Sequence, residues 1–104
     1  AVALVAKHQW VVAVHGCRGD TPRVLLGGLD LELVRDVSAR LTSRDIDVQT
    51  VGHPFEGKDP GNICNRGTTG RGLQIELTMS FREGERVDDL INVVREALMW
   101  RRAQ

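Results

Sequence analysis

The sequence predicts an α/β protein in which a mixed sheet is flanked by helices. Two observations lead to this fold class. Short aliphatic runs typical of strands alternate along the chain with segments whose apolar residues recur at helical spacing. In addition, Leu73 to Met79 alternates apolar and polar residues with a period of two, which is typical of a strand with one buried face.

Composition narrows the classes of protein that the chain can belong to. It has 104 residues, 41% of them hydrophobic and 27% charged, which is typical of a globular domain. Fourteen basic residues balance fourteen acidic ones, so no overall charge attracts nucleic acid. No apolar run approaches the roughly 20 residues that span a bilayer. We therefore expect neither a nucleic-acid partner nor a membrane partner.

The first half of the chain predicts a strand, a second strand and a helix. Within the first ten residues, Leu4, Val5 and His8 have the spacing of a helix end. The unbroken run Val11 to Val14 predicts a strand buried on both faces, ending at His15-Gly16-Cys17. Arg23 to Leu26 predicts a strand, and Asp30 caps a helix that ends near Ser43. The apolar stripe of that helix consists of Leu33, Val34, Val37 and Leu41.

The second half predicts two strands, a long loop and a final helix. Ile46 to Val51 alternates as a strand, and His53 to Thr69 is a glycine-rich loop, of a length that is often functional. The strand around Glu76 follows, and Arg82 to Arg86 turns the chain. Asp88 to Arg102 then predicts a helix, with acidic residues at its start and arginines at its end, as the helix dipole favours. Its expected buried side consists of Val87, Leu90, Ile91, Val94 and Leu98.

Two residues stand out as candidates for chemistry. His15 is expected at the end of a buried strand, at the rim where open α/β sheets place ligands. Glu76 lies at the centre of the polar side of its strand. Each has a structural alternative: His15 as a hydrogen-bonded structural residue, and Glu76 as an exposed glutamate on an edge strand.

The loop before the Glu76 strand carries possible anion-binding residues. Asn65, Arg66 and Arg71 lie there, and arginine binds carboxylates at two points, so these residues could hold an anionic substrate. The alternative is a solvated loop with capping asparagines. His53 and Glu56 have the H-x-x-E spacing of a metal-binding pair. Cys17 and Cys64 are too few for a disulfide framework and could be ligands, a reactive thiol or inert buried residues.

Four blocks together resemble a known family. V-A-V-H-G-C-R-G-D, V-L-L-G-G-L-D, D-P-G-N-I-C-N-R-G and G-R-G-L-Q-I-E-L-T-M-S-F-R, in this order, resemble the phage-type poly-γ-glutamate hydrolases between Val11 and Arg82. The resemblance implies a fold similar to zinc carboxypeptidases and hydrolysis of γ-glutamyl amide bonds with one zinc ion. It makes His15 a zinc ligand and Glu76 the general base. Arg66, Arg71 or Arg82 would then stabilise the oxyanion or hold the α-carboxylates of poly-γ-glutamate.

One block of that family has no counterpart in the 104 residues. The family's other two zinc ligands come from an upstream H-G-G-x-x-E block, whereas a catalytic zinc needs about three protein ligands. The resemblance therefore implies a single domain, residues 1–104, that forms the C-terminal segment of a larger zinc hydrolase, with an N-terminal fragment as partner. Its expected location is cytoplasmic, or outside the cell after phage lysis.

Three alternatives stay open. The chain could be a metal-free relic that binds poly-γ-glutamate or another anionic polymer. It could instead rebuild the zinc site from His53, Glu56 or a cysteine. Finally, the same zinc chemistry could act on small acylated amino acids.

Overall fold

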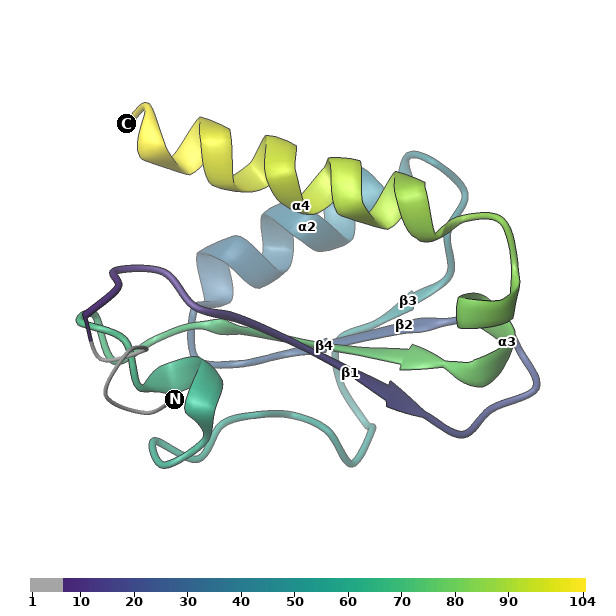
Figure 1. Ribbon diagram of the computed structural model, residues 1–104, viewed down its shortest axis with the longest axis horizontal. Helices are drawn as coiled ribbons and strands as arrows, with labels where there is room; N and C mark the ends of the chain where they lie inside the picture. Colours follow the sequence, from purple (N-terminus) through teal and green to yellow (C-terminus); the bar gives the residue numbers. More distant parts are fainter. Residues whose placement is uncertain (1–6) are drawn as a thin grey trace.

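The computed structural model describes residues 7–104 and has a four-stranded mixed sheet (Figure 1). The strands are β1 (Val12–Cys17), β2 (Val24–Gly27), β3 (Val48–Gln49) and β4 (Leu73–Thr78). Their order is β1-β4-β2-β3, with β1 parallel to β4, β4 antiparallel to β2, and β2 parallel to β3. The predicted α/β class with a mixed sheet is confirmed. β3 is shorter than the predicted strand, and Leu4 and Val5 of the expected N-terminal helix lie outside the described residues.

Helices α2 (Leu31–Thr42) and α4 (Val87–Arg102) lie side by side over one face of the sheet (Figure 1). The chain between β3 and β4, which includes the short helix η1 (Ile63–Asn65), runs along the opposite face. A third helix, α3 (Met79–Glu83), directly follows β4. Among the residues that the structure describes, no helix is long and apolar enough to cross a membrane.

Helix α2 matches its prediction. The side chain of Asp30 accepts a hydrogen bond from the backbone N–H of Leu33 at 3.2 Å, which satisfies a donor that a helix start leaves free. The helix is followed by Ser43, as expected. Its predicted apolar stripe is buried against β2 and β4, where it forms the core with side chains of both strands: Val24, Leu26, Leu33, Val34, Val37, Leu41, Leu73, Ile75 and Leu77.

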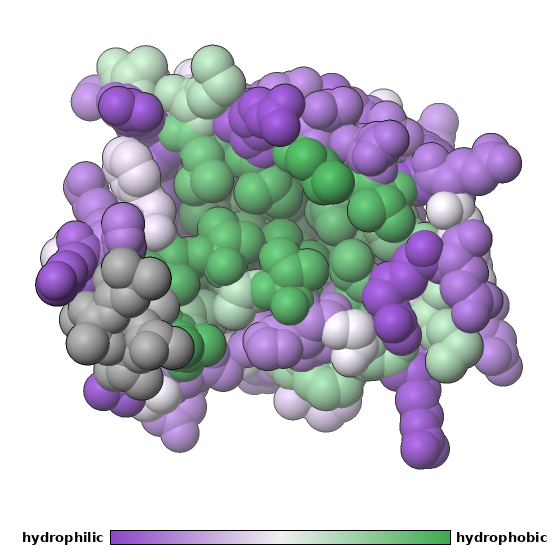
Figure 2. Space-filling model, viewed as in Figure 1, coloured by the Kyte–Doolittle hydropathy of each residue, from purple (hydrophilic) through white to green (hydrophobic). Residues whose placement is uncertain are grey.

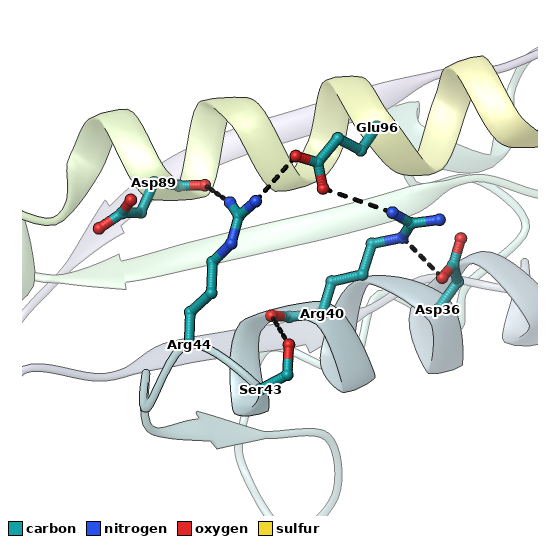
Figure 3. A network of polar contacts seen from close by, with 6 residues as sticks. All are labelled: Asp36, Arg40, Ser43, Arg44, Asp89 and Glu96. Atoms are coloured by element: carbon teal, nitrogen blue, oxygen red, sulfur yellow. Dashed lines mark hydrogen bonds and ion pairs between the residues drawn. The ribbon is translucent and has the colours of Figure 1, made fainter.

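A charged network joins α2 to α4 (Figure 3). The carboxylate of Glu96 on α4 forms ion pairs with the guanidinium groups of Arg40 at 3.4 Å and Arg44 at 2.8 Å. Arg40 also pairs with Asp36 one turn away, at 2.9 Å. At the other end of α4, Arg101 forms a 3.0 Å ion pair with the buried carboxylate of Asp30. The middle of α4 is therefore bound to α2 and to Arg44 just after it, and its C-terminal end to the residue that caps α2.

The position of β4 differs from its sequence pattern. Alternation predicted one open face, yet all six residues of β4 are buried. The reason is that β4 is a central strand, with the helices on one face and the chain after β3 on the other. Met79, expected on the apolar face, instead begins α3 and is 48% exposed.

Two predictions of full burial are wrong. β1 is an edge strand among the described residues, and its Val14 is 56% exposed although the apolar run predicted burial on both faces. On α4, Ile91 is 47% exposed, whereas Val87, Val94 and Leu98 are partly buried against the core. The fully packed side of α4 consists instead of Leu90, Val93 and Ala97.

Candidate active site

The structure brings His15 and Glu76 together. They are direct partners in the parallel pairing of β1 with β4. Paired residues on adjacent strands have Cα atoms roughly 5 Å apart and side chains on the same face of the sheet. His15 lies two residues before the end of β1 rather than at its last position. The strand register therefore explains how the imidazole of His15 and the carboxylate of Glu76 can meet at one site.

Glu76 is a buried carboxylate without a partner among residues 7–104. Its side chain is 6% exposed, and no hydrogen bond or ion pair from these residues reaches it. Its neighbour on β2 is Leu25, which is also buried and apolar. Since no fully buried side-chain oxygen of the described residues lacks a partner, the carboxylate oxygens of Glu76 keep contact with solvent although the residue as a whole is buried. The exposed-glutamate alternative for Glu76 is therefore wrong.

The other polar residues on this face of β4 are engaged. Gln74 donates to the carbonyl of Phe55 at 3.0 Å and accepts from Asn62 at 2.8 Å. Thr78 donates to the carbonyl of Thr21 at 2.8 Å and accepts from the backbone N–H of Arg23 at 3.0 Å. Within the described chain, Glu76 is thus the one polar side chain of β4 left available for chemistry.

His15 is exposed, and no hydrogen bond from the described residues engages its ring. Both ring nitrogens are therefore open to a ligand. This differs from His53, which is 7% exposed and whose Nδ1 accepts from the N–H of Phe55 at 3.1 Å. The Nε2 of His53 must then carry the proton and donates it to the carbonyl of Leu26 at 2.9 Å. His53 is a structural histidine, so the H-x-x-E pair with Glu56 does not form a metal site.

Of the candidate arginines, Arg82 has contacts with the end of β1. A Cβ atom on Gly16, the residue after His15, would lie 2.7 Å from the guanidinium carbon of Arg82. Arg82 also donates to the carbonyl of Cys17 at 3.4 Å. Arg71 precedes Glu76 by five residues along an extended segment, which separates their Cα atoms by about 16 Å.

The charged groups of this site affect the pKa of the Cys17 thiol. Burial raises the pKa of Cys17, the nearby Glu76 carboxylate raises it further, and the Arg82 guanidinium opposes both effects. Cys64 is fully buried, and burial raises its pKa as well. Both thiols are free, so the two cysteines are not paired in a disulfide.

Asn65 has a structural role in the loop before β4. It is 3% exposed, and its Oδ1 accepts from the backbone N–H groups of Leu29 and Gly72, each at 3.1 Å. Its Nδ2 donates to the carbonyls of Gly57 at 2.6 Å and Asp59 at 3.0 Å. These four bonds use the amide fully, which leaves none of its capacity for substrate. Arg66, the next residue, is exposed.

A crevice of about 390 Å³ lies on the same side of the sheet, beyond Glu76. Cys17, Leu25 and Thr78 line it, and Arg18 and Gln49 are among its polar residues. Arg18 was not among the site residues predicted from the sequence. The signal available was its place directly after the His15-Gly16-Cys17 turn.

The described residues do not form a complete metal centre by themselves. Within 7–104, no group of three or more His, Cys, Asp or Glu side chains is arranged to hold a metal ion. His15 can supply one ligand. Among the described residues, His53, Glu56 and the cysteines therefore do not rebuild the zinc site.

The mixed α/β sheet thus pairs an open histidine with a buried glutamate on parallel strands, and these are residue types that serve in acid–base chemistry and in metal binding. The sequence matches the family model described as poly-γ-glutamate hydrolase over residues 1–86, and the chain belongs to that family. The family resemblance expected from the four sequence blocks is thereby confirmed.

Two solved structures share the fold of this chain. A bacteriophage poly-γ-glutamate hydrolase superposes with a TM-score of 0.91 at 26% identity, covering 98% of this chain and 57% of that chain. A zinc-free apo form of YndL superposes with a TM-score of 0.83 at 23% identity, covering 94% and 57%, and shows the shared fold.

Two proteins of Bacillus subtilis (strain 168) are similar in sequence. UPF0714 protein YmaC is 31% identical over 81 residues, or 76% of this chain, and UPF0714 protein YndL is 28% identical over 85 residues, or 80%. Each match covers 34% of the relative. The chain thus spans about a third of the length of these relatives.

Proposed function

We propose that this chain carries the general base and one zinc ligand of an enzyme that hydrolyses γ-glutamyl amide bonds in poly-γ-glutamate. The observation that carries the proposal is the register pairing of the open His15 with Glu76, a buried carboxylate without a partner among the described residues. Membership of the poly-γ-glutamate hydrolase family supports the substrate class.

In this proposal Glu76 accepts the proton of the attacking water and later returns it to the leaving amine. Glu76 is 6% exposed beside the apolar Leu25, but no fully buried side-chain oxygen of the described residues lacks a partner, so its unpaired carboxylate oxygens remain accessible to water. His15, at the outer edge of the same site, would hold the metal through a ring nitrogen. When bound, zinc supplies a Lewis acid that polarises the amide carbonyl and makes water more acidic.

Arginine side chains near the site suit an anionic polymer. Arg82 donates to the carbonyl of Cys17 at the end of β1, but its contact with Gly16 lies on the face of the sheet opposite His15 and Glu76. It is therefore a candidate for binding an α-carboxylate of the substrate at the rim of the sheet. Arg18, in the crevice, is a candidate for an adjacent residue of the polymer. Arg71, about 16 Å along the chain from Glu76, and the exposed Arg66 would bind more distant residues of a long substrate. Asn65 supports the loop that carries them.

The missing zinc ligands are central to the proposal. A catalytic zinc has about three protein ligands, and the described residues contribute His15. We propose that the others belong to a further part of the enzyme and that residues 1–104 are a C-terminal segment. A zinc-free form of the relative YndL has been solved, which supports zinc as the metal.

The incomplete ligand set also favours one rival function, a metal-free module that binds anionic polymers. This rival predicts polymer binding without zinc and with no dependence on Glu76. A third function, hydrolysis of small acylated amino acids, predicts cleavage of monomeric substrates in preference to the polymer. Substrate profiling therefore distinguishes it from the polymer hydrolase and from the binding module.

The decisive experiment uses the product of the complete reading frame that encodes these residues. Removing a general base costs roughly 10²- to 10⁴-fold in rate, so Glu76→Gln should lower polymer hydrolysis by about 10³-fold while leaving bound zinc and polymer affinity unchanged. Glu56→Gln is the matched control, since Glu56 lies on the surface and pairs with Lys58 at 3.8 Å. Normal turnover by Glu76→Gln would exclude the assigned role, and polymer binding without hydrolysis in the wild type would favour the rival.

A further inference from the structure

The loop between β1 and β2, residues 18–23, forms one wall of the crevice of about 390 Å³. The lining residues from this loop are Arg18, Gly19, Asp20, Thr21 and Arg23. The guanidinium of Arg23 is engaged, because it pairs with Asp47 at 2.8 Å. Arg18 is exposed, and within the described chain neither Arg18 nor the acidic Asp20 forms an ion pair. Arg18 is therefore the arginine of this wall that is available to bind an anion.

The hydroxyl of Thr78 joins this loop to the strand that carries Glu76. Thr78 ends β4 two residues after Glu76, so the two side chains share one face of the sheet. Its Oγ1 donates to the carbonyl of Thr21 at 2.8 Å and accepts from the N–H groups of Arg23 at 3.0 Å and Phe81 at 3.3 Å. These three bonds use the full capacity of a hydroxyl group. An effect of this hydroxyl on substrate binding must therefore pass through the residues that it holds.

Backbone contacts fix the same loop on both sides of the hydroxyl. The N–H of Thr78 donates to the carbonyl of Arg23 at 3.2 Å, and the N–H of Ser80 donates to the carbonyl of Gly19 at 3.1 Å. A Cβ atom on Gly19 would lie 2.8 Å from the methyl carbon of Thr78, which is closer than such atoms approach. The loop is thus hydrogen-bonded to the end of β4 and packed tightly against it. Because Arg18 directly precedes Gly19, its place in the crevice wall depends on these contacts.

We propose that Thr78 is a positioning residue, which holds the 18–23 loop so that Arg18 binds an α-carboxylate of poly-γ-glutamate at the crevice. On the face drawn in Figure 2, hydrophilic side chains gather at the end of the molecule where β1 ends, which suits a charged substrate. Arginine binds a carboxylate at two points in a fixed geometry, so a displaced loop weakens the contact. The role of Arg18 rests on the proposed function; the holding of the loop by Thr78 does not.

The test is a double-mutant cycle in the product of the complete reading frame, with poly-γ-glutamate as substrate. Arg18→Gln should raise KM about 10-fold, since it removes a hydrogen bond between charged groups. Thr78→Val keeps the shape of the side chain but removes the hydroxyl, and should raise KM about 5-fold with kcat within about 2-fold of the parent. Adding Thr78→Val to Arg18→Gln should raise KM no further, because an absent guanidinium has no position to lose. Thr78→Ser retains the hydroxyl and should restore the KM of the parent.

Hydrogen exchange measures the loop directly and needs neither zinc nor substrate. The amide of Arg23 should exchange about 10-fold faster in Thr78→Val than in the parent, and at the parent's rate in Thr78→Ser. Thr42→Val is the matched control, because Thr42 is exposed at the end of α2 and its hydroxyl forms no hydrogen bond with residues 7–104. If Thr78→Val unfolds at a much lower denaturant concentration than the parent, Gly19→Ala takes its place in the cycle. That exchange displaces the loop and leaves the hydroxyl of Thr78 intact.

Three results would overturn the proposal. A fall in kcat at unchanged KM would mean that Thr78 acts on the reacting groups rather than through Arg18. Increases in KM that multiply in the double variant would show that the two residues act independently. Equal exchange of the Arg23 amide in Thr78→Val and in the parent would show that the hydroxyl does not hold the loop. If the parent hydrolyses no polymer, the hydrolase proposal fails, and the dissociation constant of the polymer replaces KM in the same cycle.

Discussion

Replacing Asn65 tests whether this residue organises the loop or binds substrate. Asn65→Ala removes four hydrogen bonds that join η1 to Leu29, Gly57, Asp59 and Gly72. A buried hydrogen bond contributes about 1 kcal/mol net, and water can replace some of the four, so we expect a loss of about 3 kcal/mol in the free energy of unfolding. With a slope of about 1.5 kcal/mol per molar urea, the unfolding midpoint should fall by about 2 M.

Urea unfolding followed by circular dichroism measures this loss. Asn92→Ala is the control, because Asn92 is exposed on α4 and the exchange should raise stability by a few tenths of a kcal/mol at most. Asn65→Asp keeps the shape of the side chain but replaces its donor, so it should be destabilised as well. An unchanged midpoint for Asn65→Ala together with weakened polymer binding would refute the structural role and restore the predicted substrate contact.

Two further predictions follow from the ion pair of α4 and from the thiol beside the site. Asp30→Ala removes both the α2 cap and the partner of Arg101, and should cost about 2 to 4 kcal/mol in a denaturant titration; Asp30→Asn, which keeps the capping oxygen, should cost less. Glu76 raises the pKa of Cys17 and Arg82 lowers it, so at pH 8 Glu76→Gln should increase the thiolate fraction and speed alkylation by iodoacetamide, whereas Arg82→Gln should slow it. Identical rates in both variants would contradict the proximity of these charges to the thiol.

The sequence predicted the elements whose signals are local. The cap at Asp30 and the four-residue stripe of α2 are set by neighbours within a few positions, and the structure confirms them. The acidic start and basic end of α4 also agree with their prediction. The family resemblance implied that His15 and Glu76 act at one site, and the structure adds that they are direct partners in the pairing of β1 with β4.

Features that depend on distant parts of the chain were not predictable from pattern alone. Alternation in β4 indicated an edge or half-buried strand, but its central place between β1 and β2 buries both faces. The H-x-x-E spacing of His53 and Glu56 gave no sign that the carbonyl of Leu26 would engage the imidazole. Asn65 resembled a loop residue open to substrate because its four backbone partners are 6 to 36 positions away.

The order of the strands also has a consequence for biosynthesis. Val12 on β1 pairs with Leu73 on β4, so β1 leaves the ribosome well before the strand that it pairs with. At roughly 5 to 20 residues per second, translation of the intervening chain takes roughly 3 to 12 s. During this interval β1 cannot pair with β4. Nascent chains should therefore depend on chaperones until Thr78 has emerged, and codon changes that slow translation between β2 and β4 should increase aggregation.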